Sequence, residues 1–274
     1  MKTILYISRL QSIKSKKRAV FFTYKYILLL FFTISFSSFT KAQDQNKIDS
    51  LTTVFNTASD PKDQINAAKS LFQMTLHLDR PNSLNYVLKY IELAKQHNNT
   101  KELGTGYNDL GMYYRFESKP DSSRFYYKKA IGLLQKIPPS SRLLKAYDDY
   151  GTMEALQGNI NTSLDILEEG YVVAEKIKNG FGMALLLKRR AFILTDAARY
   201  IDASNTLIEA SKITDTLKEP KPLLRGDLLG ATGRIEMIRG NHEIALNYFE
   251  KSHVIYEKLN HAERLAIVLN EIGI

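Results

Sequence analysis

The sequence predicts an all-α protein in which antiparallel helix pairs stack into an α-α superhelix. One observation is a repeat of about 40 residues, in which apolar residues three and four apart surround a recurring small or apolar position, as on one face of a helix. The other is that turn-forming pairs such as Asp60-Pro61 and Gly158-Asn159 separate the periodic segments, and the pattern requires no strands. The recurring position is occupied by Phe72, Gly111, Gly151, Ala191, Gly233 and Gly273.

The first segment, residues 1–42, has the order of an export signal. It contains eight Lys or Arg residues and no Asp or Glu, and an uncharged apolar run follows the basic stretch that ends at Lys25. The fifteen uncharged residues before Lys41 are fewer than the ~20 that span a bilayer comfortably. We expect a signal peptide cleaved after Ala42, with an uncleaved membrane anchor as the alternative. Either arrangement places the body outside the cytoplasm, as a periplasmic or secreted protein.

The body is predicted to begin with one helix within residues 43–58 and to continue through 59–274 as five helix pairs plus the first helix of a sixth. Proline and glycine pairs between periodic segments set the divisions. The predicted helices lie near residues 45–57, 61–77, 81–97, 101–117, 121–136, 141–157, 160–178, 182–198, 201–217, 222–239, 242–259 and 262–274.

The second repeat shows the pattern best, because its first helix carries Tyr107, Leu110, Gly111 and Tyr114 on one face. This motif resembles the tetratricopeptide repeat, in which W-x2-L-G-x2-Y opens a pair of antiparallel helices. The resemblance covers about residues 59–274 and implies a solenoid. The departures are the absence of Trp, a period near 40 instead of 34, and two glutamates where the pattern has Tyr, Glu154 and Glu236.

The last residues, 263–274, match only the first helix of a sixth repeat. Solenoids normally close with a polar-faced cap, whereas Leu265, Ile267 and Ile272 give this helix an apolar face. We expect a truncated gene product or fragment, or an end that a partner covers. The alternative is a final helix that folds back as a cap.

Charge and composition exclude several function classes. The formal charge of +9 lies almost wholly in residues 1–42, since the remainder holds 30 basic and 29 acidic residues, and a nucleic-acid partner is therefore not expected. The basic run at 188–190 is interpreted as solvated charge. Without cysteine there is no disulfide, thiolate zinc site or cysteine nucleophile, and the five histidines lack zinc-site spacing. The sequence predicts no catalytic residue, cofactor or metal ligand.

The tetratricopeptide resemblance implies that the first helix of each pair lines a concave groove that binds a protein or peptide. We expect its basic side chains to hold carboxylates or polar backbone and its apolar ones to accept an apolar anchor; the alternative is that they pack against the next repeat. A carboxylate clamp is rejected because Asp109 and Asp149 would repel the ligand, and the aromatics at 113, 116, 125 and 126 are interpreted as interhelix packing. The candidate groove residues are Lys69, Asn108, Met112, Arg115, Asp148, Thr152, Lys188, Phe192, Arg234 and Met237.

The sequence thus predicts an exported, non-catalytic scaffold that binds a protein or peptide. It also resembles the sensory N-terminal half of tetratricopeptide-containing histidine kinases or transcription regulators, which implies a signalling role. A membrane contact is expected only through an uncleaved first segment or a missing C-terminal part. The alternative is a helical-repeat hydrolase or phosphatase, which a buried carboxylate or histidine of strongly perturbed pKa in a closed cavity would reveal.

Overall fold

The computed structural model describes residues 45–273, and every regular element in that range is an α-helix. The predicted signal peptide at 1–42 lies outside the described residues. The chain divides into two compact units, Met1–Thr75 and Leu76–Ile274. In the first unit, residues 45–57 are helical and are followed by α2 (Pro61–Thr75). The fold class predicted from the repeat is confirmed.

The second unit contains the helices that build the site. Each of their bounds lies within two residues of the predicted one. These helices are α3 (Arg80–Gln96), α4 (Thr100–Phe116), α5 (Pro120–Leu134), α6 (Ser141–Leu156), α7 (Ile160–Lys176), α8 (Gly180–Asp196), α9 (Tyr200–Asp215), α10 (Pro222–Ile238), α11 (His242–Lys258) and α12 (Ala262–Ile272).

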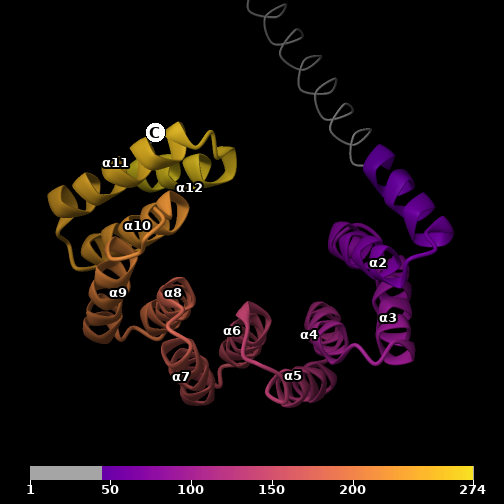
Figure 1. Cartoon of the computed structure of the whole chain (residues 1–274). Helices are drawn as coiled ribbons and strands as arrows, with labels where there is room; N and C mark the ends of the chain where they lie inside the picture. Colours follow the sequence, from indigo (N-terminus) through magenta and orange to yellow (C-terminus); the bar gives the residue numbers. More distant parts are fainter. Residues whose placement is uncertain (1–44, 274) are drawn as a thin grey trace, which may run out of the picture. The chain divides into compact units, whose positions relative to one another are not determined.

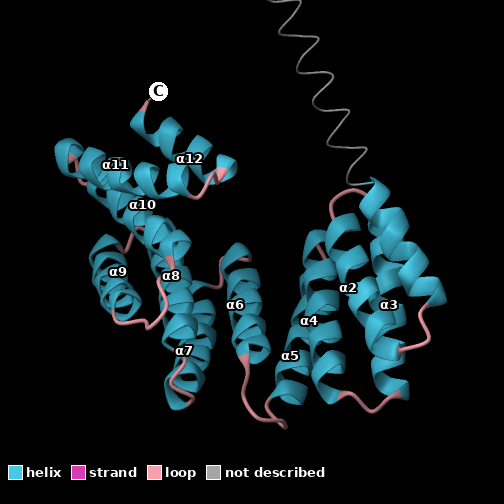
Figure 2. Ribbon diagram, turned by 45° about the horizontal axis from the view of Figure 1, so that its top comes forward, coloured by secondary structure: helices cyan, strands magenta, loops and turns pink. Residues whose placement is uncertain are grey.

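Consecutive helices of this unit form pairs that stack side by side. The extensive contacts are those of α4 with α5, α6 with α7, α8 with α9 and α10 with α11. In Figure 1, α4, α6, α8 and α10 lie on the inner side of a curved row, and α5, α7 and α9 lie on its outer side. Figure 2 shows that short loops alone connect the helices. The first helix of each pair therefore faces the concave side.

The recurring small position is where the two helices of a pair come closest. A Cβ atom on Gly111 would lie 2.8 Å from the ring of Tyr127, which fills the space below it. Likewise, a Cβ atom on Gly233 would lie 2.8 Å from the ring of Phe249. Real Cβ atoms do not approach so closely, so a small residue is required for the pair to close. This steric demand explains the period of the sequence.

A buried serine fixes the second helix of two pairs to the first. The hydroxyl of Ser123 donates a hydrogen bond to the Gly111 carbonyl at 2.8 Å, and that of Ser163 donates to the Gly151 carbonyl at 2.7 Å. Both serines are fully buried. Because a buried hydroxyl without a partner is costly, these bonds fix how the two helices are placed along each other.

Glu154, one of the departures from the tetratricopeptide pattern, occupies a buried position with 1% of its surface exposed. Arg124 of α5 donates to both of its carboxylate oxygens, at 2.6 and 3.0 Å, and Asn159 donates at 2.7 Å. The hydrogen bonds from Arg124 lower the pKa of the Glu154 carboxyl. At the equivalent place in α10, Glu236 accepts from Asn241 at 2.7 Å. A glutamate replaces the aromatic residue because the adjacent loop and helix supply its donors.

Candidate binding site

Polar side chains link neighbouring inner helices across the concave side. Asn108 of α4 donates to Oδ2 of Asp149 in α6 at 2.7 Å. One repeat later, Nε of Arg189 in α8 donates to Oδ1 of Asp148 in α6 at 2.7 Å. In both cases, one partner lies three positions before the recurring small residue of its own repeat. The other partner lies two positions before the recurring small residue of the next repeat. Much of the polar surface from α4 to α8 is therefore used to join one repeat to the next.

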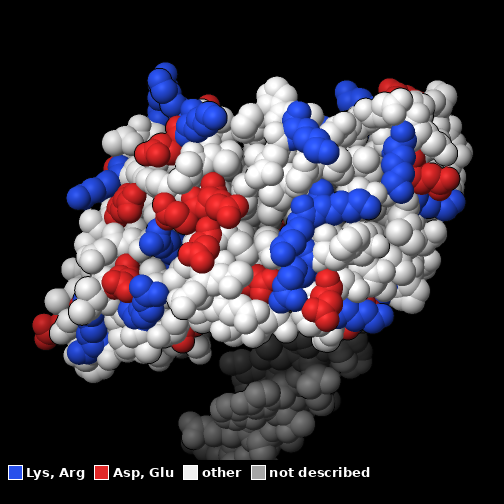
Figure 3. Space-filling view, turned by 90° about the horizontal axis from the view of Figure 1, so that it is seen from below, with Lys and Arg blue, Asp and Glu red and all other residues white. Residues whose placement is uncertain are grey.

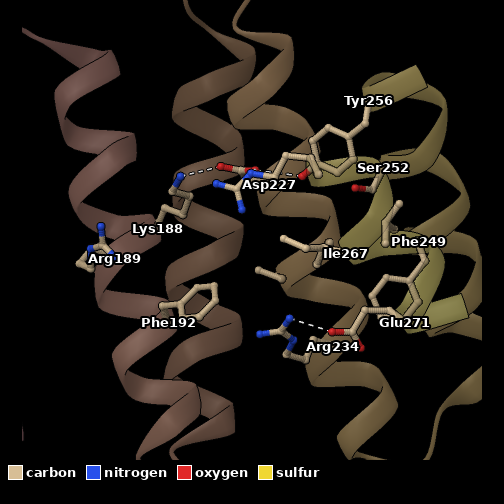
Figure 4. A pocket seen from close by; sticks show the side chains of 14 residues that line it. Lys188, Arg189, Phe192, Asp227, Arg234, Phe249, Ser252, Tyr256, Ile267 and Glu271 are labelled. Carbon is tan, nitrogen blue, oxygen red and sulfur yellow. Dashed lines mark hydrogen bonds and ion pairs between the residues drawn. The ribbon is translucent and has the colours of Figure 1, made fainter. Parts of the chain in front are cut away.

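This pattern is interrupted in α10, where the two equivalent positions are Gly230 and Ala231. Neither offers a polar side chain, and Lys188 of α8 instead reaches Asp227 of α10 at 2.7 Å. A pocket of about 260 Å³ opens at this point between α8, α10, α11 and α12 (Figure 4). A Cβ atom on Gly230 would meet only the Ser252 hydroxyl, at 3.5 Å, so the glycine leaves the pocket open.

At one end of the pocket, the largely buried carboxylate of Asp227 lies among three donors. Lys188 lies 2.7 Å from its Oδ2, and Arg264 of α12 lies 3.3 Å from its Oδ1. The hydroxyl of Tyr256 donates to Oδ1 at 2.9 Å, and burial raises the pKa of that phenol. Two cations thus share one carboxylate, which leaves a positive charge without a full counterion at this end.

The other end of the pocket is apolar and lies beside an ion pair. Phe192 and Ile267 are 43% and 41% exposed, although both are large apolar side chains. Arg234 pairs with Glu271 of α12 at 2.8 Å, and its guanidinium lies 5.5 Å from the centre of the Phe192 ring. Figure 4 shows Phe192 and Arg234 near each other on facing helices. An apolar group that entered here would cover surface that water now contacts.

The charges that line the pocket favour an anionic ligand. Four cations line it, namely Lys188 and three arginines, against two carboxylates. One of the arginines, Arg189, is neutralised by Asp148 outside the pocket. The pocket therefore combines a surplus positive charge with an exposed apolar wall, which matches a carboxylate next to an apolar group.

The structure distributes the predicted groove residues among several environments. Lys188, Phe192 and Arg234 line the pocket. Asn108 and Asp148 join repeats, as described above, and the Thr152 hydroxyl donates within its own helix to the Asp148 carbonyl. The remaining four are half-buried: Met112 and Met237 pack against the core, Arg115 lies over the ring of Phe116, and Lys69 lies in α2 of the first unit.

Two interpretations made from the sequence hold only in part. The run at 188–190 is paired as well as partly exposed, because Lys188, Arg189 and Arg190 each form an ion pair, the last with the exposed Glu168 at 2.6 Å. The aromatic group is not uniformly interhelix packing, because Phe125 is 57% exposed although Tyr113 is buried. Neighbouring residues on a helix point in different directions, and here each direction contains a partner from another helix.

Several pocket residues were not predicted from the sequence, among them Asp227, Ser252, Tyr256, Arg264 and Glu271. Asp227 and Arg264 carry opposite charges one repeat apart, as do Arg234 and Glu271. A search for opposite charges separated by about one repeat would have found both pairs. The fourth helix of the pocket, α11, contributes Ser252 and Tyr256.

The described part of the chain offers neither a metal site nor a membrane-spanning helix. Within residues 45–273, no group of three or more His, Asp or Glu side chains is arranged to hold a metal ion. Within the same range, none of the helices combines the length and the apolar character that crossing a bilayer demands.

Solved structures of other proteins share the fold described above. No protein-family model and no curated protein sequence matches the chain. Among solved structures, BtubC (BKLC) from P. vanneervenii is similar with a TM-score of 0.67 and 12% identity, over 80% of this chain and 92% of that one. Solved proteins with TPR-like repeats share the arrangement. The described helices therefore have the fold of a tetratricopeptide-like solenoid.

Two similar structures are longer proteins with described activities. Aspartyl phosphate phosphatase F from Bacillus subtilis has a TM-score of 0.62 and 13% identity, over 75% of this chain and 55% of that one. The quorum sensor NprR from B. thuringiensis has a TM-score of 0.57 and 13% identity, over 82% of this chain and 63% of that one. At this identity the likeness establishes the fold alone.

Proposed function

We propose that the protein is a non-catalytic scaffold whose concave side binds a segment of another protein or a peptide. The pocket between α8, α10, α11 and α12 anchors that segment through an apolar side chain next to a carboxylate. The observation that carries the proposal is the interruption of the polar links at Gly230, which leaves Phe192 and Ile267 exposed beside surplus positive charge.

The energetics of the pocket support a short apolar anchor. Burial of one Leu or Phe side chain of the ligand contributes about 1.5 to 3 kcal/mol to binding. The same binding event would remove Phe192 and Ile267 from contact with water. A carboxylate that reached Arg264 or Arg234 would add a charge-assisted hydrogen bond. The remaining ligand contacts would run along α8 and α6, where Lys145 is exposed beside Asp149. Such a ligand is an extended segment with one acidic and one apolar residue close together.

A filled pocket tests the proposal. In Gly230→Leu the added side chain projects from a position with free space, so the helix should be retained while the pocket is lost. We expect a random 12-residue peptide library, selected on the wild-type protein, to enrich peptides with Asp or Glu within two positions of Leu, Ile or Phe. Those peptides should bind Gly230→Leu at least about tenfold more weakly, the loss of one buried apolar side chain.

Gly132→Leu is the matched control, because Gly132 is an exposed helical glycine on the outer helix α5 with nothing within 4 Å of an added Cβ. It introduces the same side chain on the opposite side and should bind the selected peptides as the wild type does. Equal binding by Gly230→Leu and the wild type would contradict the pocket as the anchor. Absence of any enriched sequence would contradict the scaffold function.

We propose binding in preference to the hydrolase or phosphatase alternative. That alternative needs a buried acid or base of raised pKa in a cavity. The buried carboxylate Glu154 has a lowered pKa because Arg124 donates to it, so it stays ionised at neutral pH, and it does not line the pocket. Hydrolysis of p-nitrophenyl phosphate that survives in Gly230→Leu and is lost in Glu154→Gln would favour catalysis instead.

We further propose that the body functions outside the cytoplasm, after export by residues 1–42, and that ligand binding there serves signalling. The apolar run between Lys25 and Lys41 supports export. Protease added to intact cells with a permeabilised outer membrane should digest the body, and a body protected in those cells would contradict export.

A further inference from the structure

The outer faces of two neighbouring pairs carry opposite charges at equivalent positions. In α5, Lys128 and Lys129 follow the exposed Phe125 at the spacing of one helix face, and Lys136 lies two residues beyond the end of the helix. Forty residues later, α7 carries Asp165, Glu168 and Glu169 on its corresponding outer face, followed by Val172. All of these residues are exposed. We name the two surfaces the basic face of α5 and the acidic face of α7.

The two faces lie beside each other on the convex side of the second unit. Figure 3, seen from the side on which α5 and α7 lie in Figure 1, shows a group of Lys and Arg side chains next to a group of Asp and Glu side chains. Lys128 and Lys129 occupy the repeat positions of Glu168 and Glu169, and Lys136 and Asp165 each add a third charge of the same sign to their own face. The surface therefore contains equal and opposite halves.

Most of this charge is not neutralised within the molecule. In the described residues, Lys128, Lys136, Asp165 and Glu169 take part in no ion pair or side-chain hydrogen bond, whereas Glu168 pairs with Arg190. Like charges so close together repel each other, and at low ionic strength they favour any arrangement that brings in the opposite sign. The two faces are thus available to a partner that carries the complementary pattern.

An apolar side chain and a hollow accompany the two charged faces. Phe125 is 57% exposed on the basic face, and Val172 is 53% exposed on the acidic face. An open hollow of about 500 Å³, lined by Tyr147, Val172 and the carboxylates of α7, adjoins the acidic face. A partner with two lysines at the matching spacing would meet the carboxylates of α7, while the aliphatic stems of those lysines covered Val172. Lys128 and Lys129 have that spacing.

We propose that a second copy of this chain is the partner, and that two copies pair through these faces. A two-fold axis in the interface, parallel to the helices and midway between α5 and α7, places the basic face of each copy on the acidic face of the other. Such an isologous contact makes every favourable pairing twice. The body holds 30 basic and 29 acidic residues, so a net charge of only +1 opposes the approach of two copies.

A charge exchange tests the pairing. Variant A carries Lys128→Glu and Lys136→Glu, which makes both faces acidic; variant B carries Asp165→Lys and Glu169→Lys, which makes both basic. These residues are exposed and have no ion-pair partner among the described residues, so both variants should keep the circular dichroism spectrum of the wild type. The mass of the protein, purified as its host produces it, is measured by sedimentation velocity in about 50 mM salt, where charges are weakly screened.

We expect the wild type to sediment with twice the mass of one chain, and variants A and B each to sediment with the mass of one chain. An equimolar mixture of A and B should again sediment with twice the mass of one chain. Lys212→Glu, which changes an exposed lysine of α9, is the control variant and should sediment with twice the mass of one chain. The wild-type mass should fall towards that of one chain in about 0.5 M salt, because exposed ion pairs are then screened. A wild type of single mass at low salt, variants that remain double, or a mixture that stays single would overturn the proposal. Peptide binding in the pocket is read separately and does not depend on this outcome.

Discussion

Removal of Arg124 is expected to destabilise the protein strongly, because it leaves the Glu154 carboxylate buried without its main partner. Breaking a fully buried ion pair from one side costs about 3 to 5 kcal/mol. Glu154 is 1% exposed, whereas the Arg124 side chain is 31% exposed, so water screens the arginine side in part. We therefore expect the lower limit, about 3 kcal/mol, for Arg124→Ala. At ~2 to 4 °C per kcal/mol for a body of this size, the melting temperature should fall by roughly 6 to 12 °C.

The pH dependence of the same variant gives a sharper test. In the wild type, Arg124 lowers the pKa of the Glu154 carboxyl, so this group stabilises the fold above its unfolded pKa. That stabilisation is lost as the pH falls through the lower, folded pKa. In Arg124→Ala, burial without the guanidinium should raise the pKa above the unfolded value, which reverses the sign. The difference in melting temperature between the two proteins should be large at pH 7 and small near pH 4.

The assay is thermal unfolding followed by circular dichroism at 222 nm between pH 4 and pH 7. Arg199→Ala is the control, since Arg199 and Asp202 form a pair in which both side chains are about half exposed. Such a pair contributes less than about 1 kcal/mol. A loss in Arg124→Ala no larger than that of Arg199→Ala, or a difference that does not shrink towards pH 4, would refute the reasoning.

Three further predictions concern the same scaffold. Gly132→Ala should raise the free energy of unfolding by about 1 kcal/mol, because this exposed helical glycine has free space around it. Gly111→Ala should lower the free energy of unfolding by about 1 to 3 kcal/mol, because the added methyl group would press on the Tyr127 ring. Denaturant titration of both variants measures the contrast. Ser163→Ala should cost about 1 kcal/mol in the same titration, because the Gly151 carbonyl loses its buried donor. Burial and the hydrogen bond to Glu209 raise the pKa of Tyr171 to about 12. The contribution of this group to stability is therefore present below pH 10 and is lost as the pH rises towards 12. Ultraviolet absorbance at 295 nm should report the ionisation of the phenol.

The period and the turn residues predicted the helices well, because both follow from local requirements. A small residue must recur where two helices of a pair touch, as at Gly111, and a proline or glycine must end each segment. These signals lie within a few residues of the structure that they specify. The concave position of the first helices followed from the tetratricopeptide resemblance and not from the residues alone.

The pocket could be predicted only in part, since it depends on pairs that are one repeat apart. The repeat offsets predicted that Phe192 and Arg234 line the groove, but they did not predict which side chains surround these two residues. Whether Lys188 faces solvent or Asp227 depends on the approach of α8 to α10, which no local pattern encodes. The decisive feature, Gly230 at a position that holds polar residues in earlier repeats, becomes informative only when repeats are compared in space.

The central claim is that a bound segment contacts the pocket on the concave side. Replacement of Phe192 by a photo-crosslinking phenylalanine analogue, followed by irradiation in the native host and mass spectrometry, tests it most directly. We expect a crosslink to a segment in which an acidic residue stands within two positions of an apolar one, and loss of that crosslink when Gly230→Leu is added. A crosslink that persists in the presence of Gly230→Leu, or one to segments without that chemistry, would contradict it.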